Sequence, residues 1–323
     1  MMTLTDDLAQ ELLVKYEPIL IFDSDNKVLP MDTEPFVRQC SLWETPRASI
    51  SFQKPKMIKD WGSLTRQDLA RYRSPAKSVY YLYFAKLDEA TAQAMQRQGI
   101  TTTTGAIIEH GLKQYAALPA DDRQSTYHGR AFYSGDYLAL QYWFFYALND
   151  FKTSHGGIND HEGDWEGVTL FLPKEQQTPA AAAIATDTWL PTRLLAAAHH
   201  GAEAAGWDEV ERDGDHPIFY IARGSHAAYY QTGSPFPDRA DGKGEKVGPG
   251  GSKGWKRIIF PVEGPPDWVT NFDGAWGYYS RDALGGYNGP GGLTQTIKYS
   301  LLGGLSHEPR ATWVDPVGEA NLA

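Results

Sequence analysis

The stretch Tyr137-Leu-Ala-Leu-Gln-Tyr-Trp-Phe-Phe-Tyr146 is apolar or aromatic at almost every position. A continuous run of this kind is typical of a β-strand that is buried on both faces. A second strand of the same type is expected over residues 164–172. If the two strands are neighbours, Asp150 returns to the end of the sheet at which the second strand begins. The sequence therefore predicts a β-rich core centred on these two segments.

Other segments add strands, helices and one long loop to this core. Further strands are expected at three places, residues 16–22, 78–84 and 216–222. Helical patterns, some of them weak, cover residues 5–15, 88–98, 105–117 and 179–185, and Thr5 is the expected N-cap of the first. Residues 231–254 are rich in Gly, Pro, Asp and Lys, which predicts a long surface loop. We expect residues 1–323 to form a single domain, mostly β, with a β-sandwich core, peripheral helices and long loops.

Composition and charge limit the classes of function. The 323-residue chain has a formal net charge of −10, and it shows no run of Lys and Arg that would neutralise phosphates. Nucleic acid is therefore not expected as a partner. The single cysteine, Cys40, cannot form an intrachain disulfide. Neither a signal peptide nor a run of about 20 apolar residues is present, so we expect a soluble, cytoplasmic protein without a transmembrane segment.

A cluster of acidic residues and histidine precedes and enters the second core strand. Asp164 and Glu166 are two residues apart and should share one face of a strand, and His161 lies at the turn before them. An upstream carboxylate, from Asp150 or its rival Asp160, returns to the same end of the sheet. One imidazole with two or three carboxylates suits a hard or borderline divalent cation, Ca²⁺ or Mg²⁺, with Mn²⁺ as a further candidate.

The same cluster has a simpler interpretation. Two acids and a histidine near a turn can be solvated or can accept hydrogen bonds from turn amides. Here, however, the acids flank Trp165 and lead directly into an apolar strand. Partly buried carboxylates need a cation or charge-assisted hydrogen bonds to offset their desolvation. We therefore keep both interpretations and predict a cation site held by Asp150, His161, Asp164 and Glu166.

These residues resemble known families. His161-x-x-Asp164-x-Glu166 is similar to the metal-binding end of a motif in the necrosis- and ethylene-inducing-like cytolysins. More of the chain resembles the family named for vacuolar protein sorting-associated protein 62. Four groups of residues carry that likeness: Tyr16-Glu-Pro-Ile-Leu20 with Leu29-Pro30, His161-Glu-Gly-Asp-Trp-Glu166, Gly224-Ser-His-Ala-Ala-Tyr229, and Gly274-Ala-Trp-Gly277 with Gly289-Pro-Gly-Gly292 and Trp313. The resemblance implies a β-sandwich core, and the cytolysin motif implies a cation held by His161, Asp164, Glu166 and an upstream Asp.

Two further residues are candidates for proton transfer. His226, at the end of the strand over residues 216–222, could act as a general acid or base, or it could hydrogen-bond the backbone across its turn. Glu162 is a carboxylate beside the expected ligands that could move protons. Residues 285–292 are rich in glycine but lack the Lys-Ser/Thr end of a phosphate-binding loop, so a simple turn is expected there.

Three uses of the predicted cation remain open. The first is a metal-assisted enzyme, a hydrolase or a lyase or cyclase, that acts on a small or lipid-like molecule. The second is a calcium-dependent protein that binds a glycan or lipid headgroup, or a cytolysin-like protein. The third is a trafficking protein in which the cation is structural. The sequence favours the first of these and leaves the other two as alternatives.

Overall fold

A computed structural model describes most of the chain. It covers residues 3–46, 55–87, 91, 94, 103–150, 160–176, 189–198, 201–232, 241–278, 280–281, 287–288, 291–300 and 304–322. The statements below refer to these residues. The segments predicted as helical over 179–185 and most of 88–98 lie outside them.

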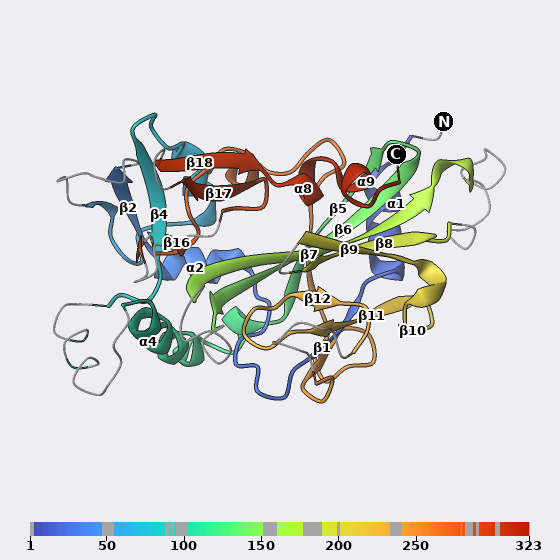
Figure 1. Ribbon diagram of the computed structural model, residues 1–323, viewed down its shortest axis with the longest axis horizontal. Helices are drawn as coiled ribbons and strands as arrows, with labels where there is room; N and C mark the ends of the chain where they lie inside the picture. Colours follow the sequence, from blue (N-terminus) through green and yellow to red (C-terminus); the bar gives the residue numbers. More distant parts are fainter. Residues whose placement is uncertain are drawn as a thin grey trace.

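The core of the fold is a pair of β-sheets. The first has six strands in the order β14-β5-β6-β7-β8-β9. Its strands are β5 (Thr126–Ser134), β6 (Tyr137–Asn149), β7 (His161–Pro173), β8 (Arg193–Ala198), β9 (Gly201–Gly206) and β14 (Lys256–Ile259). The second sheet has the order β10-β11-β1-β13, with β12 paired to β11. Its strands are β1 (Ile19–Phe22), β10 (Arg212–Asp213), β11 (His216–Ile221), β12 (Ala228–Tyr229) and β13 (Lys246–Val247). Figure 1 shows the first sheet across the middle of the molecule, with β1, β11 and β12 beside it.

The two sheets pack face to face. Phe22 of β1 contacts Tyr146 of β6 edge to face, with ring centroids 6.4 Å apart. Phe219 and Ile221 of β11 belong to the same buried cluster. Burial of these large side chains between two sheets is the main source of stability in a β-sandwich. The predicted β-sandwich core is therefore confirmed.

The opposite face of β6 and β7 is also covered. Trp165 of β7 packs against Phe145 and Trp276, with centroid distances of 5.0 Å and 5.5 Å. Trp143 lies 5.8 Å from Trp313 near the end of the chain. Both faces of this hairpin are thus buried, which is why its sequence is continuously apolar rather than alternating.

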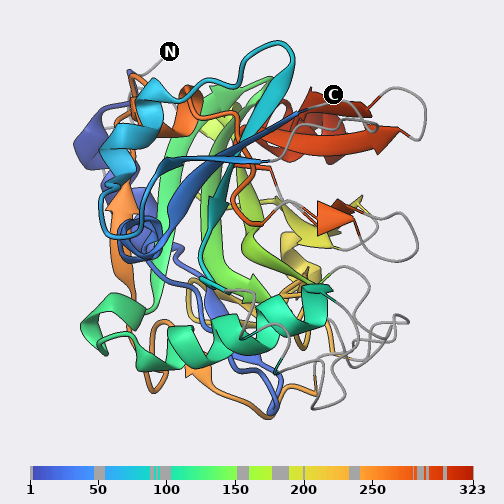
Figure 2. The ribbon, with the colours of Figure 1, turned by 90° about the vertical axis from the view of Figure 1, so that its left-hand side faces the viewer.

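Smaller sheets and helices surround this core. The additional strands are β2 (Ser41–Pro46), β3 (Lys56–Lys59), β4 (Ser78–Tyr83), β15 (Ser280–Arg281), β16 (Tyr287–Asn288), β17 (Gln295–Ser300) and β18 (Gly304–Pro309). The α-helices are α1 (Asp6–Lys15), α2 (Thr33–Gln39), α4 (Thr103–Ala117), α7 (Asp267–Thr270), α8 (Ala311–Val314) and α9 (Pro316–Glu319). Figure 2 shows the β2–β4 sheet and α4 at one end of the molecule.

Most predicted elements agree with the structure, and several differ in extent, for example β1, which begins at Ile19 and not at residue 16. Thr5 caps α1 as expected, because its side chain accepts a hydrogen bond from the Leu8 N–H. β7 begins at His161 instead of residue 164, so His161 belongs to the strand and not to a turn before it. The predicted loop over 231–254 contains β13, which pairs with β1. Among the described residues, no helix has the length and apolar character needed to cross a membrane.

Candidate cation and ligand site

A kink at Gly163 organises the start of β7. The strand pairs with β6 so that Asp164 lies opposite Tyr146, and the register then continues with Glu162 opposite Leu148. Gly163 has φ of +62°, a left-handed conformation that favours glycine. A Cβ atom there would lie 2.1 Å from the Trp276 carbonyl oxygen. Glycine at this position therefore permits both the kink and the close approach of the chain around Trp276.

The kink separates the two acidic residues on either side of it. The Glu162 carboxylate accepts hydrogen bonds from three backbone N–H groups, those of Phe84 at 3.2 Å, Ala85 at 2.6 Å and Tyr278 at 2.9 Å. Burial raises the pKa of Glu162 to about 7, although these three amides act in the opposite direction. Glu162 thus joins three segments of backbone in the interior.

Asp164 meets a different group of partners. Its Oδ2 atom lies 3.1 Å from His226 Nδ1 and accepts a longer hydrogen bond, 3.4 Å, from Asn149 Nδ2. The His226 ring is stacked on Tyr146, with 3.9 Å between centroids and an interplanar angle of 2°. Burial favours the neutral form of Asp164, but the hydrogen bond from His226 and the charges of His161 and Arg310 hold its pKa below the usual value.

The turn after β11 carries His226 into this position. Gly224 and His226 both have positive φ, +75° and +57°, and His226 is almost fully buried. A left-handed conformation is unfavourable for a residue with a Cβ atom and persists only where surrounding contacts enforce it. Stacking on Tyr146 and the contact with Asp164 supply such contacts. Adjacent Ser225 is also buried.

Glu166 and His161 complete the electrostatic environment of Asp164. Burial, followed by the neighbouring charge of Asp164, raises the pKa of Glu166 well above its usual value, with Arg310 opposing the shift. Burial lowers the pKa of His161, and Asp164 opposes that shift. Burial also lowers the pKa of Arg310 against the effect of both carboxylates. The charges of His161, Asp164, Glu166 and Arg310 therefore influence one another, while the use of the first three as metal ligands stays a prediction.

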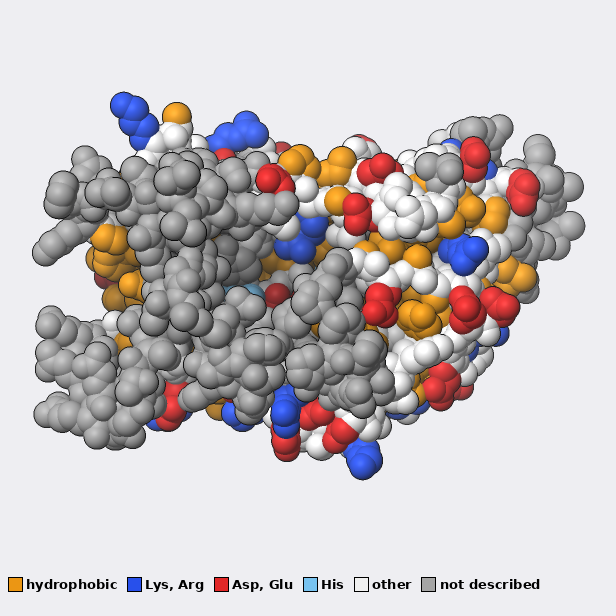
Figure 3. Space-filling model, viewed as in Figure 1, with side chains coloured by type: hydrophobic (Ala, Val, Ile, Leu, Met, Phe, Trp, Pro, Cys, Tyr) orange, Lys and Arg blue, Asp and Glu red, His pale blue; other side chains and the backbone are white. Residues whose placement is uncertain are grey.

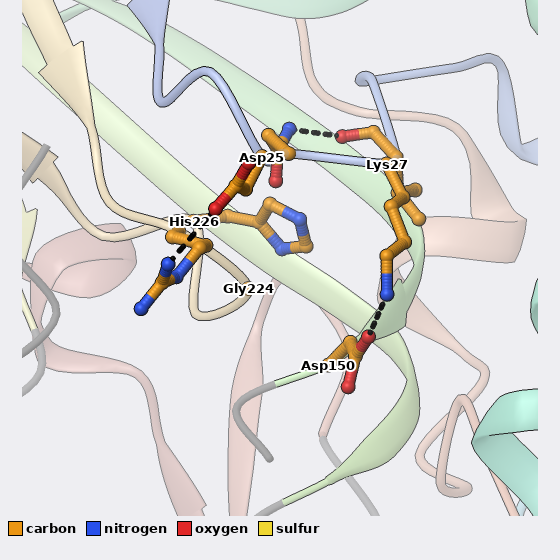
Figure 4. Close-up of a pocket in the computed structure, with 8 residues that line it drawn as sticks. Asp25, Lys27, Asp150, Gly224 and His226 are labelled. Carbon is orange, nitrogen blue, oxygen red and sulfur yellow. Dashed lines mark hydrogen bonds and ion pairs between the residues drawn. The ribbon is translucent and has the colours of Figure 1, made fainter. Parts of the chain in front are cut away.

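A cavity of about 220 Å³ opens beside His226. Its charged walls come from the turn after β1 and from the ends of β6 and β11, which contribute Asp25, Lys27, Asp150 and Arg223. Figure 4 shows the His226 ring among these residues, with Lys27 paired to Asp150 at 3.1 Å. Arg223 pairs with Asp25 at the same distance, 3.1 Å. The cavity therefore presents charges of both signs over a buried histidine.

Asp150 links this cavity to the hairpin. It follows Asn149, which pairs with His161, so it lies at the same end of the sheet as expected. Its backbone N–H donates to the Gly224 carbonyl oxygen at 3.2 Å. One carboxylate oxygen, Oδ1, is buried and has no hydrogen-bond partner among the residues that the structure describes. A buried carboxylate oxygen without a partner can accept a bond from a cation or a ligand.

The expected metal ligands do not form a ready-made centre. Within the part of the chain that the structure describes, no three His, Cys, Asp or Glu side chains are arranged around a point that could hold a metal ion. Asp160, the rival upstream acid, is fully buried. Glu162, one of the two expected catalytic groups, is absent from the lining of the cavity, whereas His226 belongs to it. Cation binding and catalysis both remain predictions.

Sequence reasoning did not identify several residues of this site. Asp25 and Lys27 follow the strand expected over residues 16–22, and Arg223 follows the one over residues 216–222, without a motif that marks them as functional. Arg310 follows Glu308-Pro309 and carries no motif. No local signal could have shown that Asp25, Lys27 and Arg223 line one cavity or that the charge of Arg310 acts on Asp164, because these residues come from segments far apart in the chain.

Comparisons with known proteins show a distant likeness of fold. No protein-family model and no curated protein matches this chain. Among solved structures, "NLPPya in complex with mannosamine" is 16% identical with a TM-score of 0.34, over 71% of this chain and 70% of that one. "Toxin fold for microbial attack and plant defense" is 20% identical with a TM-score of 0.27, over 36% of this chain and 49% of that one.

A third similar structure bears on the expected resemblance. Necrosis and Ethylene inducing Protein 2, from the causal agent of cocoa's Witches Broom disease, is 21% identical with a TM-score of 0.26. The alignment covers 38% of this chain and 52% of that one, so this chain spans about half the length of that protein. The cytolysin-type likeness thus recurs among solved structures, whereas no comparison supports the vacuolar protein sorting-associated protein 62 family. Scores this low carry no argument about the site.

Proposed function

We propose that this protein binds a small, hydroxylated ligand of the sugar class in the cavity beside His226, with the help of a divalent cation. The observation that carries the proposal is the contact between His226 and Asp164. This contact joins Asp164, a proposed cation ligand, to a residue that lines a cavity whose walls bear charges of both signs. Sugar hydroxyls both donate and accept hydrogen bonds, so they suit such a wall.

The donor set fits a hard cation. Asp164 and Glu166 lie close enough for the charge of Asp164 to raise the pKa of Glu166. A divalent cation between two such carboxylates would relieve their repulsion, and Ca²⁺ and Mg²⁺ prefer oxygen ligands. Because no three His, Cys, Asp or Glu side chains of the described residues already surround one point, His161 or Asp150 would have to turn toward this pair on binding. In this proposal the cation and Arg310 both balance the charge of the two carboxylates.

An enzymatic role is the second candidate, and one contact favours it. With Nδ1 directed to Asp164, the other ring nitrogen of His226 is available to a molecule in the cavity. Proton transfer by a histidine oriented in this way is common in enzymes. The second expected catalytic group, Glu162, instead holds three backbone amides. We therefore rank binding above catalysis.

Calorimetric titration tests the binding proposal. Mannosamine is the probe, and N-acetylmannosamine is the matched control without the ammonium group. We expect mannosamine to bind in the presence of Ca²⁺ or Mg²⁺ and to lose most of its affinity after EDTA treatment. Asp150→Asn should weaken binding about tenfold, because a charged hydrogen bond contributes roughly 1.5 kcal/mol. Binding that is unchanged by EDTA would remove the cation from the proposal.

Metal content provides a separate test. Mass spectrometry of the purified wild type should find one equivalent of divalent cation, and Asp164→Asn should lose it. If the wild type carries no cation and shows no thermal shift with Ca²⁺, Mg²⁺ or Mn²⁺, the acidic cluster is a hydrogen-bonded structural feature. An equivalent of metal that persists in Asp164→Asn would instead show that the ligand assignment is wrong.

A further inference from the structure

Positively charged residues are concentrated in one segment of a chain whose net charge is negative. Residues 55–86 contain seven Lys and Arg but only two acidic residues, both Asp, within a chain whose formal net charge is −10. This segment forms β3, the turn after it, a 3₁₀ helix over Arg66–Arg71, and β4. Figure 3 shows cationic side chains projecting from the upper left, over the end of the molecule that holds β4, while acidic side chains are spread over the right.

The tertiary structure gathers part of this charge around β3. β3 is an edge strand of the β3-β2-β4 sheet, and both Lys56 and Lys59 are exposed. Hydrogen bonds from Thr65 lower the pKa of Asp68, and the nearby charges of Arg71 and Lys59 lower it further. Arg71 is paired with this carboxylate, at 3.5 Å between its Nη1 atom and Asp68 Oδ1. Four residues of a strand span only about 10 Å, which is within one Debye length at physiological salt.

Exposed apolar side chains lie within the same segment. Met57 is 42% exposed and Trp61 is 36% exposed, and they are two of the four large hydrophobic side chains found exposed among the described residues. The Lys86 ammonium group lies 6.0 Å from the centre of the Trp61 ring. Figure 2 looks onto the end of the molecule that carries this sheet. We use the name β3 patch for six residues: Lys56, Met57, Lys59, Trp61, Arg71 and Lys86.

We propose that the β3 patch is a contact surface for an anionic lipid bilayer. Lysine and arginine near such a surface are attracted to its headgroups, and tryptophan prefers the boundary between headgroups and acyl chains. An extended polyanion such as duplex nucleic acid would use cations in a long row and would gain nothing from Met57. The β3 patch is separate from the cavity at His226, so this proposal does not depend on the proposed function.

Vesicle co-sedimentation of the full chain tests this surface. The probes are vesicles of phosphatidylcholine with 30% phosphatidylserine and vesicles of phosphatidylcholine alone, at about 0.1 M and 0.5 M salt. We expect binding only to the anionic vesicles at the lower salt concentration. Lys56→Gln with Lys59→Gln should reduce partitioning roughly 30-fold, since each cation contributes about 1 kcal/mol. Trp61→Ala should reduce it several-fold.

A matched double variant tests whether vesicle binding depends on the position of the lysines or only on the net charge of the protein. Lys243→Gln with Lys253→Gln removes the same charge from exposed lysines of another segment and should leave partitioning unchanged. Equal loss in both double variants would overturn the proposal, as would wild-type protein that stays in the supernatant with anionic vesicles. Lysines on an edge strand can also prevent sheet-to-sheet association. Self-association of the β3 variant, without lipid binding by the wild type, would assign the lysines that role instead.

Discussion

Glu162 and Asp164 are separated by one glycine on the same strand, yet they belong to two different regions of the molecule. Glu162 accepts hydrogen bonds from three backbone amides in the interior. Asp164 contacts His226, whose ring lines an open cavity. The same chemical group therefore holds the fold together on one side of Gly163 and orients a potential binding residue on the other. Backbone geometry, and not residue type, assigns these roles.

Substitution of the glycine itself should have the largest effect. Gly163→Ala combines a left-handed conformation with a Cβ atom 2.1 Å from a carbonyl oxygen. We expect a loss of roughly 4 kcal/mol in the free energy of unfolding, or failure to fold. Gly62→Ala is the matched control, because Gly62 also has positive φ but no atom within 4 Å of the added Cβ. Equal losses in the two variants would show that the contact with Trp276 is unimportant.

Removal of the Glu162 carboxylate should have the next largest effect. Glu162→Ala leaves three buried N–H groups without their acceptor, so we expect a loss of about 3 kcal/mol in urea denaturation at pH 6. Affinity for mannosamine should not change in the protein that remains folded. A variant that folds normally but loses ligand affinity would place Glu162 at the cavity and contradict the division described above.

The pH dependence of stability should identify Glu162 independently. Burial raises its pKa to about 7 in the folded protein, above the ordinary value of 4.5. The unfolded chain therefore releases this proton first, and the contribution of Glu162 to stability falls as pH rises from about 4.5 to 7. The change is at most roughly 3 kcal/mol. Glu162→Gln should flatten this part of the curve, and an unchanged slope would assign the dependence to another group.

Substitution of Asp164, on the other side of Gly163, should change the free energy of unfolding less than the affinity for ligand. Asp164→Asn keeps the shape of the side chain and one oxygen acceptor, so we expect a loss of only about 1 kcal/mol. Cation content and mannosamine affinity should both fall at least tenfold. Asp136→Asn, at an exposed position in the turn between β5 and β6, is the control and should change neither. If a stable Asp164→Asn protein keeps full affinity for mannosamine, Asp164 does not contribute to ligand binding in the cavity.

The smallest effect on stability is expected at Asp150. Its ion pair with Lys27 involves a lysine side chain that is 63% exposed, and such pairs contribute little. Thermal unfolding of Asp150→Asn should therefore match the wild type to within about 0.5 kcal/mol. The tenfold weaker mannosamine binding expected above would then be a local effect. A large loss of stability would instead show that Asp150 supports the fold.

Much of the fold could be predicted because its signals are local. The apolar run over residues 137–146 predicted a doubly buried strand, and residues 164–172 predicted its neighbour. Thr5 predicted the start of α1. The limits of β7 were less accurate, since His161 and Glu162 are polar and were not expected inside a strand. They are accommodated there because the Glu162 carboxylate finds three amide donors contributed by distant segments.

The sequence by itself determined the β-rich core and the grouping of His161, Asp164 and Glu166, because short spacing along one strand fixes which side chains can meet. Only the tertiary structure decided that Glu162 binds backbone amides and that His226 contacts Asp164, with the charge of Arg310 acting on the same carboxylate. It also decided that Asp25, Lys27 and Asp150 border one cavity. These relations depend on how separate strands and turns pack, and at Gly163 the backbone of Trp276 lies so close that an added Cβ atom would be 2.1 Å from its carbonyl oxygen.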